Sequence, residues 1–294
     1  MILLWGIPSE PPVRLAAEAA QRRGTRYAVV NQRHAAGDDI VFDAATGSGR
    51  LFVDGHWIDL AEVSGVYVRI MDPHLLPEAR TGTVEHRDRS AAFHAMLLAW
   101  ADQADCRVAN PTNAMATNGS KPYQAQLIGA AGFETPVTLV TNDVRQVLNF
   151  EQEHGELVYK STSSVRSIVR PLDDAARRRL PLLAHLPVQF QRRERGTDVR
   201  VHVVGDRILA AQAVTEAVDY RYASRDGEPL ELRATALPED VAARCRRLAR
   251  LLGLPFCGVD LMRRADGTWV CFEVNPSPGY SWYEQQADLP ISDA

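Results

Sequence analysis

Cysteine is scarce in this sequence, which has four among 294 residues and no C-x-x-C pair. The four are scattered at Cys106, Cys245, Cys257 and Cys271, so the sequence indicates neither a zinc site nor a disulfide framework. We expect all four to be small buried hydrophobic side chains. The eight histidines show no H-E-x-x-H spacing and there is no G-x-S-x-G elbow, so no motif points to covalent catalysis.

A strong charge of either sign is also absent, since the formal net charge is −4 and the pI is about 6.1. This balance gives no general attraction to nucleic acid or to acidic membranes, although local arginine clusters can bind phosphate. No apolar run is long enough to span a bilayer, and the start lacks the features of a signal peptide. We therefore expect a cytoplasmic protein without a nucleic-acid or membrane partner.

Hydrophobic residues make up 46% of the chain, which at this length is enough to fill the cores of two domains. The first part alternates strands and helices, which predicts a small α/β domain over residues 1–110. Its expected elements are strands at 2–6, 27–30 and 65–70 and helices at 11–23 and about 87–106. The expected buried stripe of the last helix is Phe93, Met96, Leu97 and Trp100. Residues 110–112 read as a linker.

The remainder of the chain predicts helices and short strands without an internal repeat. Expected helices cover 121–131, 238–252 and a segment ending at His154 that Asn142 caps. Expected strands cover 137–140, 157–160, 166–170 and 187–191. A hairpin turning at 205–206 carries Asp198, Arg200 and His202 on the face opposite its valines. That polar face is either a solvated outer surface or part of a site.

The last hairpin, residues 257–276, carries the most informative side chains. Asp266 and Gly267 are the dipeptide that a two-residue type I′ turn prefers, because both central positions need a positive φ. Counting outward from a turn centred there places Asp260 directly opposite Glu273. The sequence therefore predicts two carboxylates facing each other across a strand pair.

Asn275 falls on the same face as Glu273, because side chains alternate along a strand. Facing carboxylates repel unless a cation lies between them, and Asp, Glu and Asn offer only oxygen ligands, which suit Mg²⁺ or Mn²⁺ rather than zinc. The alternative is a pair of solvated side chains on an open sheet face. Two features favour the metal site: the strand stops abruptly at residues 276–279, and its opposite side looks like core. The residues expected on that core side are Val259, Leu261, Phe272 and Val274.

Taken in order, these features resemble the ATP-grasp superfamily, in the branch of the ribosomal-protein S6 glutamate ligase (RimK-like) and the graspetide (microviridin-type) peptide ligases. The resemblance covers residues 110–280 and is most specific in G-V-D-L-M followed by F-E-V-N-P; S-K-P-Y-Q and V-Y-K-S add to it. It implies an α/β (α+β ATP-grasp) fold. An N-terminal α/β domain at 1–110 would precede an ATP-grasp domain at 111–294, whose lobes, about 111–186 and 187–294, clasp ATP.

The resemblance also implies a role for each residue of the nucleotide site. The implied magnesium ligands of Mg-ATP are Asp260, Glu273 and Asn275. The implied phosphate contacts are Lys121 and Lys160. The implied adenine connector is Gln189, Phe190 and Gln191, and the implied ribose contact is Asp198. Arg200 and Arg221 are implied to face the γ-phosphate and the acyl intermediate.

Two positions depart from the family's pattern. The phosphate-covering loop of the S6 ligase is rich in glycine, whereas the loop from Ser161 to Arg166 here is rich in hydroxyl groups. Gln189 stands where a glutamate is usual. Both departures concern contacts to the nucleotide rather than the metal ligands.

The implied reaction is an ATP-dependent ligation in which a substrate carboxylate becomes an acyl phosphate, ADP is released, and an amine or a hydroxyl then displaces phosphate. A kinase on the same fold and a non-catalytic nucleotide-binding module are the alternatives. Retention of the metal ligands together with Lys121, Lys160 and Arg200 argues against a module that only binds.

The expected partners besides ATP are a peptide or amino-acid substrate, in particular a ribosomally made precursor peptide, and a second copy of the chain in a homo-oligomer. Arg69, at the end of an expected strand, either holds a substrate carboxylate or is a surface arginine. The aromatic run at 280–284 either lines the acceptor pocket or packs in the core.

Overall fold

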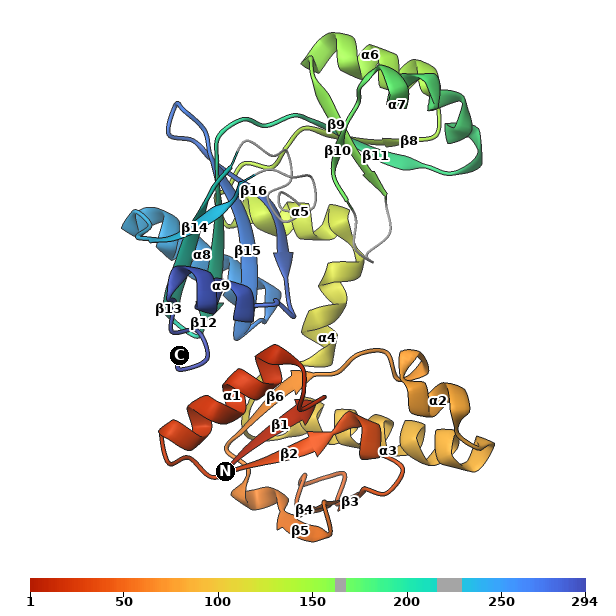
Figure 1. The fold of residues 1–294 in the computed structure, drawn as a ribbon, viewed down its shortest axis with the longest axis vertical. Helices are drawn as coiled ribbons and strands as arrows, with labels where there is room; N and C mark the ends of the chain where they lie inside the picture. The colour runs from red at the N-terminus through yellow and green to blue at the C-terminus, as the bar shows by residue number, and fades with distance from the viewer. Residues whose placement is uncertain (162–167, 216–228) are drawn as a thin grey trace.

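The computed structural model describes residues 1–161, 168–215 and 229–294, and Figure 1 shows its ribbon. Within these residues the strands form four sheets, of four, four, five and three strands. Residues 1–109 form one four-stranded and the three-stranded sheet, and residues 138–275 form the other two. This mixture of helices and sheets agrees with the predicted fold class.

The first sheet is parallel, with the strand order β2–β1–β6–β7. Its strands are β1 (Ile2–Gly6), β2 (Tyr27–Asn31), β6 (Gly65–Arg69) and β7 (Arg107–Ala109). Because parallel strands need a crossover, α1 (Pro11–Arg22) joins β1 to β2, and α3 (Val84–Gln103) lies between β6 and β7. The short helix α2 (Pro77–Thr81) precedes α3, and α4 (Thr112–Met115) follows β7.

The buried stripe of α3 differs from the predicted one at a single position. Three of the four predicted residues are buried: Phe93, Leu97 and Trp100. The prediction was wrong for Met96, which is 42% exposed. The buried face of the helix runs through His94 and Ala101 instead, on the other side of the stripe.

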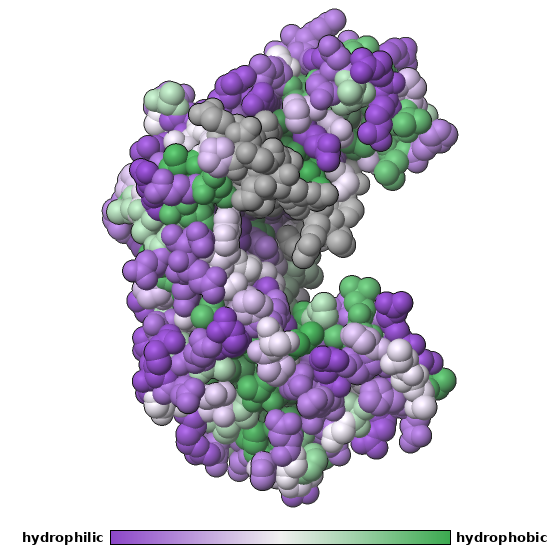
Figure 2. All heavy atoms as spheres, in the orientation of Figure 1, coloured by the Kyte–Doolittle hydropathy of each residue, from purple (hydrophilic) through white to green (hydrophobic). Residues whose placement is uncertain are grey.

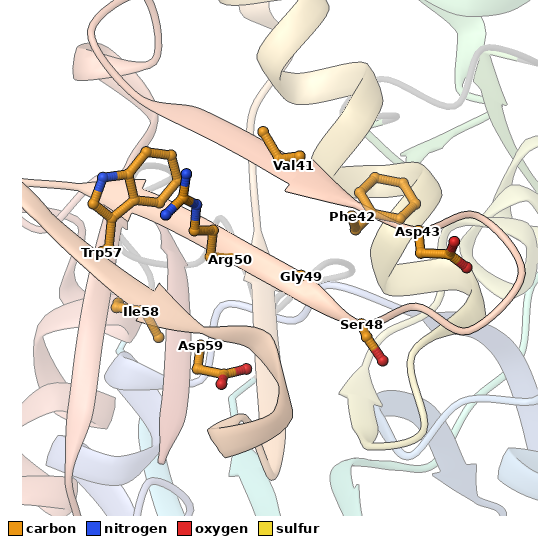
Figure 3. Close-up of a pocket in the computed structure, with 9 residues that line it drawn as sticks. All are labelled: Val41, Phe42, Asp43, Ser48, Gly49, Arg50, Trp57, Ile58 and Asp59. Atoms are coloured by element: carbon orange, nitrogen blue, oxygen red, sulfur yellow. The ribbon is translucent and has the colours of Figure 1, made fainter.

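The three-stranded sheet is antiparallel and consists of β3 (Asp39–Phe42), β4 (Gly49–Val53) and β5 (His56–Asp59). Figure 3 shows the open hollow on it, about 500 Å³ in volume, where Arg50 lies 4.2 Å from the ring centroid of Trp57. In Figure 1 this sheet lies at the opposite end of the molecule from α6. We assign the hollow no role in the chemistry described below.

The second four-stranded sheet has antiparallel pairs in the order β10–β9–β11–β8. Its strands are β8 (Thr138–Thr141), β9 (Leu157–Ser161), β10 (Arg170–Pro171) and β11 (Val188–Arg192). The helices beside it are α6 (Val144–His154) and α7 (Asp174–Arg178). The predicted N-cap Asn142 of α6 was wrong by one residue: Asp143 caps the helix by accepting a hydrogen bond from the Arg145 amide at 2.8 Å.

The five-stranded sheet has the order β14–β13–β12–β15–β16, all antiparallel. Its strands are β12 (Thr197–Val204), β13 (Arg207–Val214), β14 (Glu231–Thr235), β15 (Phe256–Arg263) and β16 (Trp269–Asn275). The helices α5 (Lys121–Ala130) and α8 (Glu239–Leu252) share the core on one face, and α9 (Ser281–Ala287) packs on the other. Both faces are therefore covered.

Three cysteines behave as the sequence predicted, since Cys245, Cys257 and Cys271 are buried in this core. Burial raises the pKa of the Cys245 and Cys257 thiols to about 12, so both stay protonated and unreactive near neutral pH. The prediction was wrong for Cys106, which is only half-buried at the edge of the first domain's core.

Strand and helix contacts cross the lobe border that the sequence predicts. The lobe border expected from sequence falls at residue 187, and β11, which begins at Val188, hydrogen-bonds to β8 and β9 of the four-stranded sheet. Helix α5, from the first expected lobe, packs against β16 and α8. Figure 2 shows a hollow on the side of the molecule between the first domain and the lobe that carries α6 and α7. In the described part of the chain, no helix has the length and apolar character needed to cross a membrane.

Candidate active site

The facing carboxylates are present, although the predicted turn is not. Asp260 pairs with Glu273 across β15 and β16, as predicted. The type I′ turn was wrong, because Gly267 has a positive φ of +87° and Asp266 does not. Instead the Gly267 amide donates to the Arg264 carbonyl at 3.0 Å. This longer turn shifts the adjacent strand pairs by one residue from the predicted register.

A β-bulge at Phe272 corrects that shift. Leu261 pairs with Cys271 while Asp260 pairs with Glu273, so one extra residue stands in β16 between the two pairs. The bulge turns Cys271 into the core, where burial raises the pKa of its thiol well above the usual value. The prediction that Phe272 belongs to the core was therefore wrong, and its ring lines the pocket beside the carboxylates.

Each of the two carboxylates is paired with a cation. The Arg200 guanidinium of β12 donates Nη1 to Asp260 Oδ1 at 2.6 Å, and the Lys121 ammonium at the start of α5 donates Nζ to Glu273 Oε2 at 2.6 Å. Both pairs are largely shielded from solvent, so their attraction is stronger than that of surface pairs. These cations offset the repulsion between the two carboxylates.

Asn275 completes the set of oxygen donors. Its Oδ1 accepts a hydrogen bond from the Ser277 amide at 2.9 Å, which fixes the side-chain amide at the end of β16. Among the described residues no group of three His, Cys, Asp or Glu side chains forms a metal site. Two carboxylates and one amide oxygen nevertheless fit Mg²⁺, which commonly takes one or two protein carboxylates and completes its shell with phosphates and water.

A pocket of about 540 Å³ lies between the four-stranded and five-stranded sheets beside this pair. Lys121 from α5, Lys160 from β9 and Phe272 from β16 line it. Val137 and Val140, both partly exposed, add apolar surface. The pocket therefore offers two cations, from α5 and β9, and an apolar wall, which suits a ligand with phosphates and a flat base.

The predicted adenine connector is strand β11, whose side chains alternate between two environments. Gln189 and Gln191 are buried and line the pocket, and the Gln191 amide donates to Thr138 Oγ1 at 2.9 Å. Phe190 points to the other face, into the core around Val147. The Phe190 side chain therefore points away from the pocket, and only its backbone can face the pocket.

The polar face of β12 is covered rather than solvated. Arg200 and His202 are both buried, and both lie against the Tyr283 ring of α9, at 5.7 Å and 5.0 Å from its centroid. Burial, and then the Arg200 charge, hold the pKa of His202 well below its usual value, so the imidazole is neutral. Tyr283 thus packs in the core, and His202 shares a face with Arg200 as predicted. Asp198, two residues before Arg200 on β12, is half-buried and pairs with Met262 of β15.

Two of the predicted features lie outside the described residues. Arg221 falls in 216–228, and the loop residues after Ser161 fall in 162–167.

With this geometry in view, comparison with known proteins decides the family. The profile of the RimK-like ATP-grasp domain matches residues 107–293. The chain belongs to the RimK-like ATP-grasp family. A probable alpha-L-glutamate ligase of Stenotrophomonas maltophilia strain K279a is 27% identical to it over 272 residues, which cover 80% of this chain and 89% of the relative.

Solved structures of ATP-grasp ligases are similar over nearly the whole chain. The ligase PsnB, solved with a phosphomimetic variant of its minimal precursor, Mg and ADP, has a TM-score of 0.80 and 28% identity, covering 99% of this chain and 95% of that one. The macrocyclase MdnC of Microcystis aeruginosa MRC, bound with precursor peptide MdnA, has a TM-score of 0.80 at 19% identity, covering 100% and 97%. The second likeness shows the fold alone. Together these findings confirm the predicted ATP-grasp fold and the predicted enzyme class, an ATP-dependent, ADP-forming ligase.

In this RimK-like ATP-grasp chain, Gln124 holds the strand that carries Glu273 and Asn275. Its Nε2 donates to the Val274 carbonyl at 2.9 Å, and its Oε1 accepts from the Val274 amide at 3.0 Å. Because β16 is an edge strand, these backbone groups have no neighbouring strand on that side in the described part of the chain. A buried side-chain amide on α5 therefore takes the place of a further strand.

We expect Gln124→Ala to destabilise the protein by about 2–6 kcal/mol, since two buried backbone groups lose their partners at about 1–3 kcal/mol each. Urea unfolding of the purified variant measures this. Gln126→Ala is the matched control, because Gln126 is exposed on the same helix. Equal stability of the two variants would show that the Gln124 contacts contribute nothing.

Asn110, which the sequence placed in a linker, is a second buried amide that was missed. Its Nδ2 donates to the carbonyls of Phe256 and Pro276, and its Oδ1 accepts from the Phe256 amide at 3.0 Å. One side chain thus joins the start of β15 to the residue after Asn275. No local pattern distinguishes such an asparagine from a turn residue.

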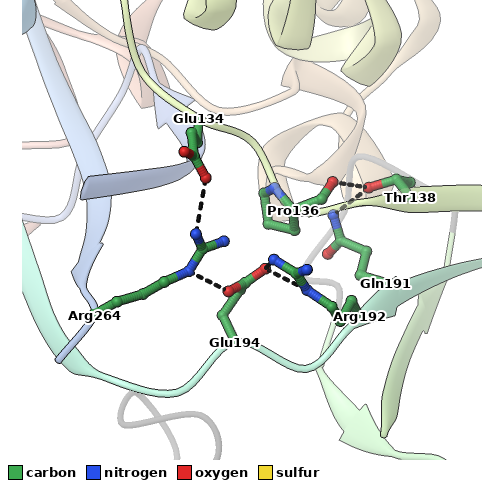
Figure 4. Close-up of polar contacts among 7 residues, drawn as sticks. All are labelled: Glu134, Pro136, Thr138, Gln191, Arg192, Glu194 and Arg264. Carbon is green, nitrogen blue, oxygen red and sulfur yellow. Dashed lines mark hydrogen bonds and ion pairs between the residues drawn. The ribbon is translucent and has the colours of Figure 1, made fainter. Parts of the chain in front are cut away.

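The segments that connect the four-stranded and five-stranded sheets are fixed by ion pairs, which Figure 4 shows. Glu194 accepts from Arg192 at 2.9 Å and from Arg264 at 2.7 Å, and Arg264 also donates to Glu134 at 2.8 Å. Glu194 and Arg264 are both largely buried, so the network joins the two crossing segments to the tip of the β15–β16 hairpin. It therefore helps to position the two sheets on either side of the pocket.

Proposed function

We propose that this ATP-grasp ligase activates a peptide carboxylate with Mg-ATP and joins it to an amine or a hydroxyl, giving an amide or an ester. The observation that carries the proposal is the pair of facing carboxylates, Asp260 and Glu273, each 2.6 Å from a cation beside the pocket. PsnB, at 28% identity, was solved with its precursor, Mg and ADP, which supports a ribosomally made precursor peptide as the substrate here.

Asp260, Glu273 and Asn275 would hold the magnesium of Mg-ATP, and Mn²⁺ would satisfy the same oxygen donors. When bound, the metal neutralises charge on the phosphate oxygens. Lys121 and Lys160 bind the phosphates from two sides of the pocket, because they reach it from α5 and β9. These assignments explain why two cations and two carboxylates lie at one place.

The remaining residues of the pocket bind the nucleoside. Gln189 and Gln191, with the backbone of Phe190, hold adenine against the apolar wall, and Asp198 holds the ribose. Arg200 faces the reacting phosphate, and Arg221 is assigned beside it by resemblance to the family.

The reaction follows from positioning and charge neutralisation without a covalent residue. A carboxylate oxygen of the substrate attacks the γ-phosphorus, the bond from that phosphorus to the bridging oxygen breaks, and ADP leaves. Arg200 and Arg221 stabilise the charge that develops on the transferred group. An amine or hydroxyl then attacks the acyl carbon, and phosphate leaves as the acyl–oxygen bond breaks.

A hydroxylamine trap tests the proposal. The protein is incubated with ATP, Mg²⁺, hydroxylamine and pools of amino acids, small acids and peptides, while ADP is quantified and hydroxamates are sought by mass spectrometry. We expect ADP together with the hydroxamate of a peptide carboxylate, and neither when EDTA removes the metal. ADP with a phosphorylated product and no hydroxamate would contradict the ligase reaction in favour of a kinase.

Three sequence predictions about the whole protein stay predictions. They are the division into a domain at 1–110 and two lobes at about 111–186 and 187–294, the formation of a homo-oligomer, and the cytoplasmic location.

A further inference from the structure

Arg69, at the end of β6 in the first domain, reaches the loop that follows the proposed metal ligand Asn275. Its Nη1 donates to the Ser277 carbonyl at 3.1 Å, to Ser277 Oγ at 3.0 Å and to the Pro278 carbonyl at 2.9 Å. Its Nε donates to Glu10 Oε1 at 2.8 Å. The side chain is 13% exposed. The guanidinium therefore bonds to protein acceptors on two sides, which argues against the surface arginine of the two sequence alternatives.

The Glu10 carboxylate is the ion-pair partner of Arg69. It stands at the N-cap of α1, and its carboxylate makes no hydrogen bond to that helix. Its Oε1 accepts from Arg69 Nε at 2.8 Å, and Arg69 Nη2 lies 2.8 Å from the same oxygen as an ion pair. A charge-assisted pair of this geometry fixes the plane of the guanidinium and so aims Nη1 at the loop.

The loop from Pro276 to Tyr280 is anchored to the first domain and the linker along its length. Asn110 holds the Pro276 carbonyl, Arg69 holds the next two residues, and the Tyr280 hydroxyl donates to the Pro12 carbonyl at 2.5 Å. The Ser277 amide, within this anchored loop, donates to Asn275 Oδ1. The chain of contacts therefore runs from β6 through the loop to the Asn275 side chain.

We propose that Arg69 is a positioning residue for Asn275, so that the N-terminal domain completes the metal site of the ATP-grasp domain. The inference rests on the proposed function, because it takes Asn275 as a metal ligand. Arg69 does not touch the metal or the nucleotide. It holds Ser277, whose amide orients the Asn275 oxygen, and groups that orient metal ligands in this way commonly affect metal affinity.

The test is the Mg²⁺ dependence of ADP binding, measured by calorimetry on the full chain at a series of Mg²⁺ concentrations. We expect Arg69→Gln to raise the half-saturating Mg²⁺ concentration by about 10-fold, as is typical when a partner of a metal ligand is removed. Arg69→Lys, which keeps the charge beside Glu10 but loses the planar fork, should shift it in the same direction. The matched control is Arg26→Gln, because Arg26 is an exposed arginine of the same domain that pairs with Glu62.

Asn275→Ala, measured in parallel, distinguishes a failure of the positioning role of Arg69 from a failure of the metal assignment of Asn275. Asn275→Ala is expected to raise the half-saturating Mg²⁺ concentration. If it does so while both Arg69 variants behave like Arg26→Gln, the positioning role of Arg69 is wrong and the assignment of the metal site is supported. If Asn275→Ala has no effect, the metal assignment itself is wrong and the inference falls with it. A merely structural role would lower the melting temperature of Arg69→Gln without moving the Mg²⁺ dependence, and that result would also overturn the inference.

Discussion

Glu273→Gln should reduce ATP-dependent ligation by at least about 100-fold, the scale of removing one group that stabilises transition-state charge. The substitution keeps the shape of the side chain and removes its charge. It takes away one of the two carboxylates proposed to hold the metal and the partner of Lys121. Folding should change little, because the change also relieves the repulsion from Asp260 across the strand pair.

Coupled measurement of ADP release and hydroxamate formation tests this prediction. Glu231→Gln is the matched control, since Glu231 is an exposed carboxylate that pairs with Arg233 on β14, at the far edge of the same sheet. A Glu273→Gln protein that kept both Mg-ADP binding and turnover would show that the facing carboxylates are not the metal site.

The hairpin that carries Glu273 shows what the sequence could and could not predict. The pairing of Asp260 with Glu273 was predicted correctly, yet two irregularities that cancel produce it. The turn at Asp266 and Gly267 is longer than the preferred one for this dipeptide, and the bulge at Phe272 compensates. The residues of a turn favour one turn type but do not determine it, and no local sequence pattern marks a β-bulge. The position of Phe272 in the pocket could therefore not be predicted from the sequence.

Elements with a clear periodicity were predicted well, because their burial depends on spacing within one segment. β1 was predicted residue for residue, and α1 to within one residue. The residues that were missed act over long sequence distances. Gln124 contacts Val274, and Asn110 contacts Phe256 and Pro276, so their roles appear only when distant segments meet. Each reads locally as an ordinary polar side chain on a helix or in a linker.

The two missed amides and Arg69, whose partners the sequence did not reveal, share one feature, since all hold β15, β16 or the loop after them. Gln124 holds the edge of β16, Asn110 joins its end to β15, and Arg69 holds the following loop. The proposed metal ligands lie on β15 and β16, which β12 holds on one side and α5, the linker and Arg69 hold on the other sides. Sequence motifs therefore mark the ligands, whereas their geometry depends on contacts that motifs do not record.

Gly258→Ala should have a comparably large effect through Arg200. A β-carbon built at Gly258 would lie 2.1 Å from Nη2 and 2.4 Å from Cζ of Arg200, much closer than any real contact. The guanidinium lies over this glycine while it donates to Asp260 and contacts Tyr283, so an added methyl group must displace it. We expect turnover to fall by about 100-fold, as on loss of one charge-stabilising donor. The cost in stability should be about 1–3 kcal/mol, typical of overpacking.

Gly129→Ala is the matched control, because Gly129 is an exposed residue of α5 with nothing near its would-be β-carbon. It should be stabilising by about 0.5–1 kcal/mol, the usual preference for alanine in a helix. The mechanism is tested by combining Gly258→Ala with Arg200→Ala. If Gly258 acts by leaving room for the Arg200 side chain, the double variant should be no less active than Arg200→Ala. It should also be more stable than the sum of the stability losses of the two single variants predicts. Additive losses of turnover would mean that Gly258 is required for a reason other than the position of Arg200.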